Sequence, residues 1–421
     1  MLEDFLKSYN LNIHQLSIRS GIPESTFRYL NKRELGRWNI EYIEAIANVL
    51  EKDKHIVIDE LSQLMKKKST QTVLGKYDIE NRRYIGSKNK LLAWLSELMD
   101  QYTKGVSFFD VFAGTGVVSV KMLPRYDKII MNDFLYSNNI IYNAFLGTKP
   151  YDATKLITVK EEFNSITKRI QDDSYFEDNF GGRFFSNRDA MVIGEIRTRI
   201  ENNHGLSERE RDILIASLIY SSDKIANTVG HYDAYRKKVN IPDRFCFDLI
   251  NPINVAGKEI VIYREDANKL VRKVEADISF IDPPYNSRQY SRFYHVLEGI
   301  AKWDKPKLEG VAMKPPVENM SNYCKNSAPA TFDDLITHLN TKYIVVTYNN
   351  TYDSKSHSSQ NKITHDEIIS SLNKVGKTRI FESPFQFFNA GKTDLQNHKE
   401  FVFITEVKST THGASAGGSR L

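Results

Sequence analysis

Cysteine is almost absent from this chain: Cys246 and Cys324 are the only two among 421 residues. Two thiols are too few for the disulfide framework of a small secreted protein or for a zinc cluster. We therefore predict no metal site. The scarcity of cysteine also favours a reducing compartment, since disulfides persist in oxidising ones.

Long hydrophobic runs are missing as well. No stretch approaches the ~18 apolar residues that a membrane-spanning helix needs, and the opening "MLEDFLKSYN" lacks the basic end and apolar centre of a signal peptide. We therefore expect no membrane segment and a cytoplasmic protein. The excess of one charge sign is small, at +5, which is only a weak indication of a polyanionic partner.

The pattern of the chain changes several times along its length. Short helical periodicities such as "NIEYIEAIANVL" fill the first part, and a polar, basic stretch follows. Short β-branched strands then alternate with helical segments, which predicts an α/β layer with a mainly parallel sheet. We predict a small all-α domain (1–65), a linker (66–81), an α/β domain (82–149 and 258–407) with a mostly helical insertion (150–257), and a disordered tail (408–421).

One candidate site is the segment "FFDVFAGTGVVSVKML". A strand ends at Asp110, a loop carries Gly114 and Gly116, and a helix begins. Glycines let the backbone approach a ligand whose polar end can use the helix N-terminus, although a purely structural turn fits equally well. Asp133, at the end of the next strand, stands where an acid reaches ribose hydroxyls in Rossmann-type sites. Its alternative role is to cap the helix that follows.

A second candidate is the loop in "FIDPPYNSRQY", at the carboxyl end of a buried strand, where open α/β sheets bind ligands. Pro283 and Pro284 fix the backbone and remove two N–H donors, so carbonyl groups face the cleft. A carboxylate at Asp282, a bare carbonyl and the ring of Tyr285 suit a planar ring that carries an amino group. The polar residues that follow make an ordinary strand-ending turn the weaker interpretation.

The motifs also occur in a characteristic order. "RRYIGSKNKLL", "FFDVFAGTG", "MNDF", "YREDA", "IDPPYNSRQY" and "YIVVTYNN" follow one another as they do in the Dam-like, α-group DNA adenine-N6 methyltransferases, which the chain resembles over residues 82–407. It most resembles the branch found in bacterial restriction–modification systems. The resemblance implies a Rossmann-like methyltransferase sheet and S-adenosylmethionine as cofactor. It also implies a duplex DNA substrate whose target base is flipped out, and a cognate restriction endonuclease as partner.

The resemblance also assigns roles to individual residues. It implies that the loop from Asp282 to Tyr285 is catalytic, with Asp282 and the Pro283 carbonyl accepting hydrogen bonds from the adenine amino group and Tyr285 stacking on the ring. An acid at this position argues against protein-glutamine methylation, whose enzymes usually begin the motif with asparagine. Two departures are Tyr84, where tryptophan is common, and FAGTG in place of an FxGxGS loop. The implied cofactor-binding residues are Tyr84, Lys88 (near the methionine end), Asp110, Gly114, Gly116, Asp133 (ribose), Asp266 (adenine) and Asp282.

By its position, the insertion would read the target sequence. Its segment "SDKIANTVGHYDAYRKKVNIPDRF" interleaves basic and aromatic residues, which suits phosphates and base edges, although a solvated loop explains most such runs equally well. Polar residues after the catalytic loop either contact DNA or cap a helix. The candidate DNA-binding residues are Tyr232, Tyr235, Arg236, Lys237, Lys238, Asn286, Arg288 and Tyr290.

The N-terminal segment "IHQLSIRSGIPESTFRYLNKR" resembles a Cro/repressor-type helix–turn–helix, with the turn at Gly21 and a second helix from Pro23. Yet residues 1–70 contain eleven Lys and Arg against ten Asp and Glu, a poor balance for non-specific DNA affinity. Operator binding and a packing or dimerising role therefore both stay open. For the whole chain, the alternatives are a DNA-binding regulator with a degenerate methyltransferase fold and an RNA adenine methyltransferase. The intact Asp282–Tyr285 loop favours the DNA enzyme over the regulator.

Overall fold

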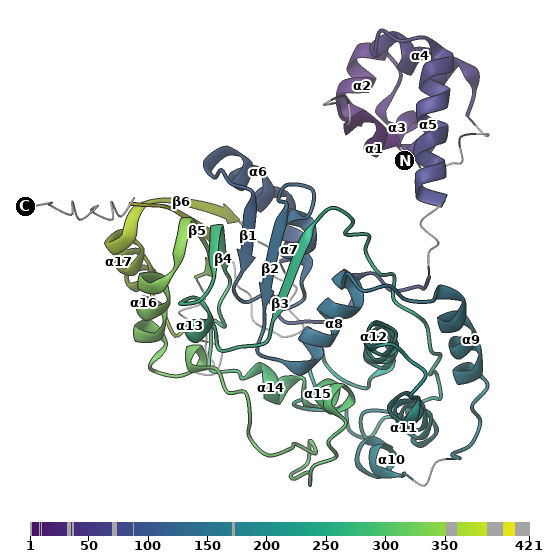
Figure 1. Ribbon diagram of the computed structural model, residues 1–421, viewed down its shortest axis with the longest axis vertical. Helices are drawn as coiled ribbons and strands as arrows, with labels where there is room; N and C mark the ends of the chain where they lie inside the picture. The colour runs from purple at the N-terminus through teal and green to yellow at the C-terminus, as the bar shows by residue number, and fades with distance from the viewer. Residues whose placement is uncertain are drawn as a thin grey trace, which may run out of the picture. The chain divides into compact units, whose positions relative to one another are not determined.

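The computed structural model divides the chain into two compact units, Met1–Val73 and Leu74–Leu421 (Figure 1). Of the predicted tail, only Lys408 lies within the described part of the chain. The residues described are 2–7, 9, 11–31, 35, 38–69, 74–86, 88–170, 173–350, 360–384 and 399–408. None of the helices in these ranges is long and apolar enough to cross a membrane.

The first unit is all-helical, as predicted. A capping box between Asn12 and Gln15 starts α2, and Gly21, at φ 73° in the left-handed region, ends it. Leu16 and Phe27, from the two helices on either side of this turn, are buried in the unit's own core. The helices are α1 (Leu2–Lys7), α2 (Ile13–Ser20), α3 (Glu24–Asn31), α4 (Ile40–Val49) and α5 (Lys54–Ser69).

The predicted linker over 66–81 is wrong at both ends. Helix α5 continues to Ser69. Leu74, Tyr77 and Ile79 are buried in the core of the second unit, where Tyr77 pairs with Ile250. A few apolar side chains spaced along an extended segment are enough to anchor it, although its average composition is polar.

The second unit contains a seven-stranded sheet in the order β3-β2-β1-β4-β5-β7-β6. The strands from β3 to β5 in this order are parallel, whereas β7 runs antiparallel to both of its neighbours. This confirms the mixed α/β, mainly parallel prediction. The strands are β1 (Ser107–Asp110), β2 (Lys128–Asn132), β3 (Glu259–Tyr263), β4 (Glu275–Ile281), β5 (Asn340–Asn349), β6 (Gly376–Pro384) and β7 (Lys399–Val407).

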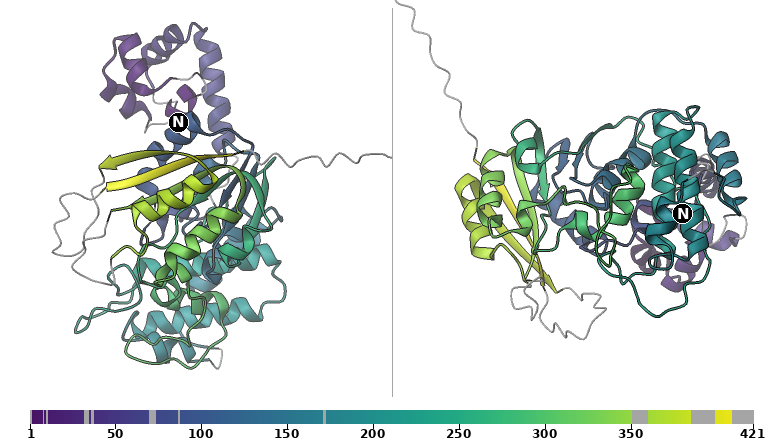
Figure 2. Two further views of the ribbon diagram at one scale, coloured as in Figure 1. Left: turned by 90° about the vertical axis from the view of Figure 1, so that its left-hand side faces the viewer. Right: turned by 90° about the horizontal axis from the view of Figure 1, so that it is seen from below.

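Alternating side chains of the strands supply the two core layers. Phe108 faces one layer and Phe109 the other. The first layer contains side chains from α6 (Leu92–Tyr102), α7 (Val117–Met122) and α8 (Tyr136–Leu146). The second contains those of α13 (Ala267–Leu270), α16 (Ala328–His338) and α17 (His365–Val375), and the left view of Figure 2 shows α16 and α17 in front of the sheet.

The strand order places a crevice at one edge of the sheet. From β1 the chain proceeds to β2 on one side, and from β4 it proceeds to β5 on the other. The loops that leave the carboxyl ends of β1 and β4 therefore diverge. Such a switch point is where open α/β sheets bind ligands.

The insertion is helical up to Ile225, and residues 226–258 contain neither helix nor strand. Its helices are α9 (Ala153–Asn164), α10 (Tyr175–Phe180), α11 (Asn187–Asn202) and α12 (Glu208–Ile225). The predicted capping box starts α12: Ser207 N donates to Glu210 Oε2 at 2.9 Å, and Glu210 N donates to Ser207 Oγ at 3.3 Å. Phe184 and Ile215 share one core with Phe108 of the sheet, so the insertion is not packed separately.

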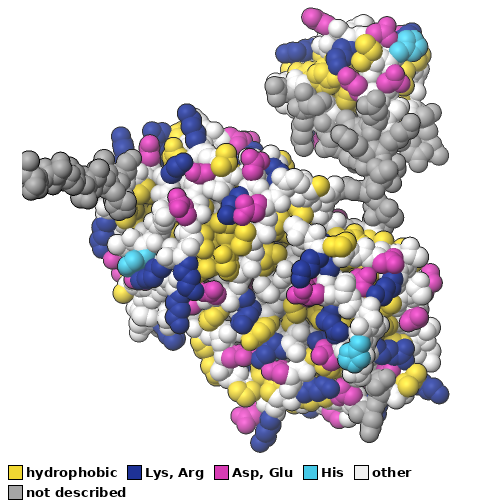
Figure 3. Space-filling model, in the orientation of Figure 1, with side chains coloured by type: hydrophobic (Ala, Val, Ile, Leu, Met, Phe, Trp, Pro, Cys, Tyr) yellow, Lys and Arg dark blue, Asp and Glu magenta, His cyan; other side chains and the backbone are white. Residues whose placement is uncertain are grey.

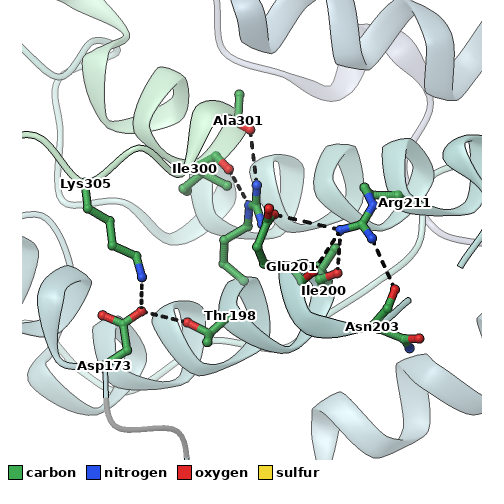
Figure 4. A network of polar contacts seen from close by, with 10 residues as sticks. Asp173, Thr198, Ile200, Glu201, Asn203, Arg211, Ile300, Ala301 and Lys305 are labelled. Atoms are coloured by element: carbon green, nitrogen blue, oxygen red, sulfur yellow. Dashed lines mark hydrogen bonds and ion pairs between the residues drawn. The ribbon is translucent and has the colours of Figure 1, made fainter. Parts of the chain in front are cut away.

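Buried Arg197 of α11 joins the insertion to α15 (His295–Lys302), which follows α14 (Tyr290–Phe293). Its Nε donates to the Ile300 carbonyl at 2.7 Å and its Nη2 to the Ala301 carbonyl at 3.3 Å, while Nη1 pairs with Glu201 at 2.7 Å (Figure 4). These bonds satisfy carbonyl groups in the last turn of α15, which have no partners within the helix.

Candidate active site

A cavity of about 450 Å³ opens at the carboxyl ends of β1, β2 and β4. It brings together seven of the eight predicted cofactor-binding residues: Tyr84, Lys88, Asp110, Gly114, Asp133, Asp266 and Asp282. The sequence did not assign several other residues of its wall to a cofactor site: Phe112, Asn132, Phe134, Gln289, Asn319, Ser321 and Tyr323. Phe112, Phe134 and Gln289 lie inside the motifs already singled out, but the segment 319–323 gave no signal.

The glycine loop after β1 forms one wall. Gly114, at φ +53°, donates its N–H to Asp133 Oδ2 at 3.1 Å, and its carbonyl accepts a bond from Tyr142 at 2.7 Å. A Cβ at Gly114 would lie 3.5 Å from the Tyr84 ring, so the missing side chain leaves room at this wall. Gly116 is not among the cavity residues, because it is packed against Ile79 and Tyr142. Gly116 was predicted to contact the cofactor directly, but in the structure it has a packing role.

Two carboxylates of the wall, the buried Asp110 and the half-buried Asp133, have different surroundings. Asp110 is fully buried: Oδ2 accepts a bond from Ser119 at 2.7 Å, whereas Oδ1 has no hydrogen-bond partner among the described residues. Burial raises the pKa of Asp110 to about 7. Asp133 accepts the N–H groups of Gly114 and, at 2.8 Å, Leu135, and burial raises its pKa. Asp133 thus ties the glycine loop to the loop after β2.

Of the predicted cofactor-binding acids, Asp266 caps a helix, whereas Asp133, for which capping was the alternative role, does not. Glu298 of α15 caps α8 by accepting the N–H groups of Tyr136 at 3.0 Å and Ser137 at 2.8 Å, so Asp133 does not perform this function. Asp266, in contrast, is the N-cap of α13 and accepts the N–H of Lys269 at 3.1 Å. Its side chain both caps a helix and lines the cavity.

The loop after β4 places Asp282 in a tight polar cluster. Asp282 Oδ1 lies 2.9 Å from Lys88 Nζ and accepts hydrogen bonds from Thr347 Oγ1, also at 2.9 Å, and from the Tyr285 hydroxyl. Lys88 Nζ in turn donates to the Tyr285 hydroxyl at 2.6 Å. Burial raises the pKa of Asp282, and the charge of Lys88 acts in the opposite direction. Lys88 therefore lies beside the Asp282–Tyr285 loop.

Tyr285 does not present its ring to the cavity in this structure. Its ring packs against Tyr348 with centroids 4.5 Å apart, and Tyr285 is absent from the cavity wall. The wall is instead supplied by Tyr84 and Tyr290, whose rings stack at 5.2 Å. Tyr290 also donates its hydroxyl to the Ile85 carbonyl at 3.2 Å. Tyr290, predicted to contact DNA, thus lies in the cavity wall.

The predicted DNA-binding residues of the insertion divide into a buried and an exposed group. Tyr232 is buried and donates its hydroxyl to Asp223 at 3.0 Å, so its assignment to DNA was wrong. Tyr235 is half-buried against the Phe184 ring, at a centroid distance of 5.3 Å. The two tyrosines thus anchor the segment in the core. The exposed residues are Arg236, Lys237 and Lys238.

Two predicted DNA-binding residues after the Asp282–Tyr285 loop, Asn286 and Arg288, are half-buried. Asn286 accepts the N–H of Arg288 at 3.1 Å in a local turn, and the Arg288 guanidinium lies 5.8 Å from the centroid of the Phe293 ring. On the face that Figure 3 shows, Lys and Arg side chains alternate with Asp and Glu rather than gather in one basic surface. Charge on this face therefore does not mark a single DNA-binding surface.

The chain belongs to the D12 class of N6 adenine-specific DNA methyltransferases, whose family model matches residues 84–363. It is therefore an enzyme that methylates N6 of adenine in DNA and uses S-adenosylmethionine as the methyl donor. The predicted reaction and cofactor are confirmed at this level.

Individual relatives agree with the family. The type II methyltransferase M.NlaIII of Neisseria lactamica is 28% identical over 339 residues, which cover 77% of this chain and 98% of the relative. The type II methyltransferase M.FokI of Planomicrobium okeanokoites is 30% identical over 77% of this chain and 52% of its own length. The modification methylase StsI of Streptococcus sanguinis is 33% identical over 64% of this chain and 44% of its own length. The chain thus spans nearly all of the first relative and about half of the other two.

Proposed function

We propose that this protein is a Dam-like, α-group methyltransferase that modifies adenine within one specific duplex DNA sequence. In this proposal it acts in the bacterial cytoplasm and protects host DNA from a cognate restriction endonuclease. The names of the relatives, type II methyltransferases and a modification methylase, support the restriction–modification setting. The observation that carries the catalytic assignment is Asp282, held by Lys88 at the wall of a cavity that Asp110 and Asp133 also line.

The cavity has the donors and acceptors that S-adenosylmethionine requires. Bound there, the cofactor supplies a methyl group on a positively charged sulfur. Asp110 would accept a hydrogen bond from its ammonium group, because Oδ1 of this buried carboxylate has no other partner among the described residues. Asp133 would hold the ribose hydroxyls and Asp266 the adenine ring, while Gly114 leaves room for them at the wall.

Asp282 would orient the amino group of the target adenine. Its carboxylate and the Pro283 carbonyl would accept hydrogen bonds from the two N–H groups. This favours a tetrahedral nitrogen whose lone pair can attack the methyl group of the cofactor. A strong base is unnecessary at this stage, so orientation and electrostatics are the contribution of the protein. The base must first leave the DNA stack, at a cost of a few kcal/mol that contacts in the site would offset.

DNA recognition is proposed for two separate parts of the chain. The exposed Arg236, Lys237 and Lys238 of the insertion would contact the target duplex, together with Arg288. The helix–turn–helix formed by α2 and α3 would bind operator DNA. Arg28 of α3 pairs with Glu24 at 2.6 Å, so part of its charge is already neutralised within the helix.

The catalytic assignment is tested by Asp282→Ala and Asp282→Asn in the full-length protein. We expect methyl transfer to duplex DNA to fall by at least ~100-fold, the scale of losing one preorganised catalytic group, while cofactor affinity stays within a few-fold. Transfer is measured from tritiated S-adenosylmethionine, with RNA assayed beside duplex DNA. Turnover near the wild-type rate by Asp282→Asn would refute the role of this carboxylate.

A further inference from the structure

The carboxylate of Asp282 is held through a single oxygen. Among the described residues, all three of its donors meet at Oδ1: Lys88 Nζ and Thr347 Oγ1, each at 2.9 Å, and the Tyr285 hydroxyl. Asp282 also lines the cavity. One oxygen is thus used to fix the side chain, which leaves Oδ2 for a ligand.

Thr347 reaches this oxygen from the neighbouring strand. In the register of β4 and β5, Ile281 is opposite Val346, so Asp282 and Thr347 are the next residues along the two parallel strands. Thr347 is 1% exposed, and its carbonyl lies 3.5 Å from the Tyr285 hydroxyl. The next residue, Tyr348, donates its hydroxyl to the Tyr285 carbonyl at 3.3 Å. The end of β5 therefore supports both the acid and the aromatic residue of the loop.

Packing alone does not explain a threonine at this position. The preceding residues, Val345 and Val346, are buried valines, and valine has nearly the shape of threonine without the hydroxyl group. The hydrogen bond to Asp282 is the one that the Thr347 hydroxyl donates. A β-branched side chain on a strand has a stiff χ1 torsion, whereas the terminal torsion of an aspartate is broad. Threonine is thus suited to fix the rotation of the carboxylate.

We infer that Thr347 is a positioning residue for methyl transfer, whose hydroxyl orients the Asp282 carboxylate so that Oδ2 faces the amino group of the target adenine. This inference rests on the proposed catalytic role of Asp282. Lys88 supplies charge from a long, flexible side chain, while Thr347 supplies direction from a rigid strand. Small errors in the orientation of a reacting group are costly, so the loss of this bond should lower the rate of the chemical step.

The test compares Thr347→Val and Thr347→Ser in the full-length protein. We expect Thr347→Val to lower the single-turnover rate by roughly tenfold, less than the loss of the carboxylate itself, with KM for DNA and affinity for S-adenosylmethionine within about twofold of wild type. Thr347→Ser keeps the hydroxyl and should restore most of the rate. Thr405→Val is the control, because Thr405 is a fully buried strand threonine whose hydroxyl pairs with Thr378 instead.

Several results would overturn the inference: a wild-type rate in Thr347→Val, a loss that Thr347→Ser or Thr405→Val shares, or a loss seen only in KM or cofactor affinity. If Thr347→Val does not fold, Thr347→Ala must show the same slow single turnover, and a wild-type rate there is equally contradictory. Asp282→Asn is measured in parallel. An inactive Asp282→Asn beside a fully active Thr347→Val refutes only this inference, whereas an active Asp282→Asn refutes the catalytic assignment itself.

Discussion

Replacing Gly116 with alanine should destabilise the second unit by about 2–5 kcal/mol, the sum of two separate costs. The first is conformational: Gly116 has φ +78°, and an L-residue in the left-handed region costs about 1–2 kcal/mol. The second is steric. A Cβ would lie 3.0 Å from Ile79 Cδ1 and 3.2 Å from both Met131 Cε and Tyr142 Cε1. Such overpacking costs about 1–3 kcal/mol.

Gly257 offers a matched control for the conformational cost. Its φ is +77°, but no atom lies within 4 Å of the position of its Cβ. Gly257→Ala should therefore cost only about 1–2 kcal/mol. Urea unfolding followed by near-ultraviolet circular dichroism compares the two variants, and calorimetry compares their affinities for S-adenosylmethionine. Because the neighbours Thr115 and Val117 line the cavity, Gly116→Ala should also bind the cofactor more weakly. Equal destabilisation by both substitutions would refute the packing argument.

Two further predictions concern the division of labour in the chain. Asp133→Ala should weaken cofactor binding by about 1–3 kcal/mol, measured by calorimetry, because it removes a charged acceptor from the cavity and from the N–H of Gly114. Asp127→Ala is the control and should have no effect, because Asp127 is exposed just before β2, the strand that Asp133 follows. Unchanged affinity in Asp133→Ala would confine the role of Asp133 to holding the loop. Deleting residues 1–73 should leave the methylated DNA sequence unchanged, because the insertion and its exposed basic residues remain. The modified adenines are mapped for both proteins at equal salt concentration. A changed target sequence would assign its recognition to the first unit.

Much of the fold could be predicted from short β-branched runs, because buried parallel strands have a continuous apolar sequence. The strands from β1 to β5 and β7 all fall on such runs. Strand β6, at one of the two edges of the sheet, pairs only with β7 and was missed. Its sequence, "GKTRIFESP", is largely polar, and Ile380 is 48% exposed. A strand with so few apolar residues has no strong apolar signal, even though β3, at the other edge, has one.

Site residues could be predicted from the sequence where they stand directly at the end of a recognisable strand. Asp110, Asp133 and Asp282 were found because each stands at the carboxyl end of its strand, and these ends meet at one edge of the sheet. Thr347 could not be assigned, since its contact with Asp282 depends on β4 and β5 being neighbours. Tyr232 was misassigned for a similar reason: its basic surroundings in the sequence are not its neighbours in space.

Buried polar contacts connect the insertion to segments near the cavity. Asp223 of α12 accepts the N–H of Arg83, next to the cavity residue Tyr84, and also the hydroxyl of Tyr232. Arg197 of α11 holds the end of α15, and Glu298 of α15 caps α8. Buried polar groups therefore connect the insertion directly to the segment before Tyr84, and through α15 to the start of α8. An exchange of this insertion for that of a relative would leave these groups unpaired unless their partners were exchanged with it, because a buried charge that loses its partner is strongly destabilising.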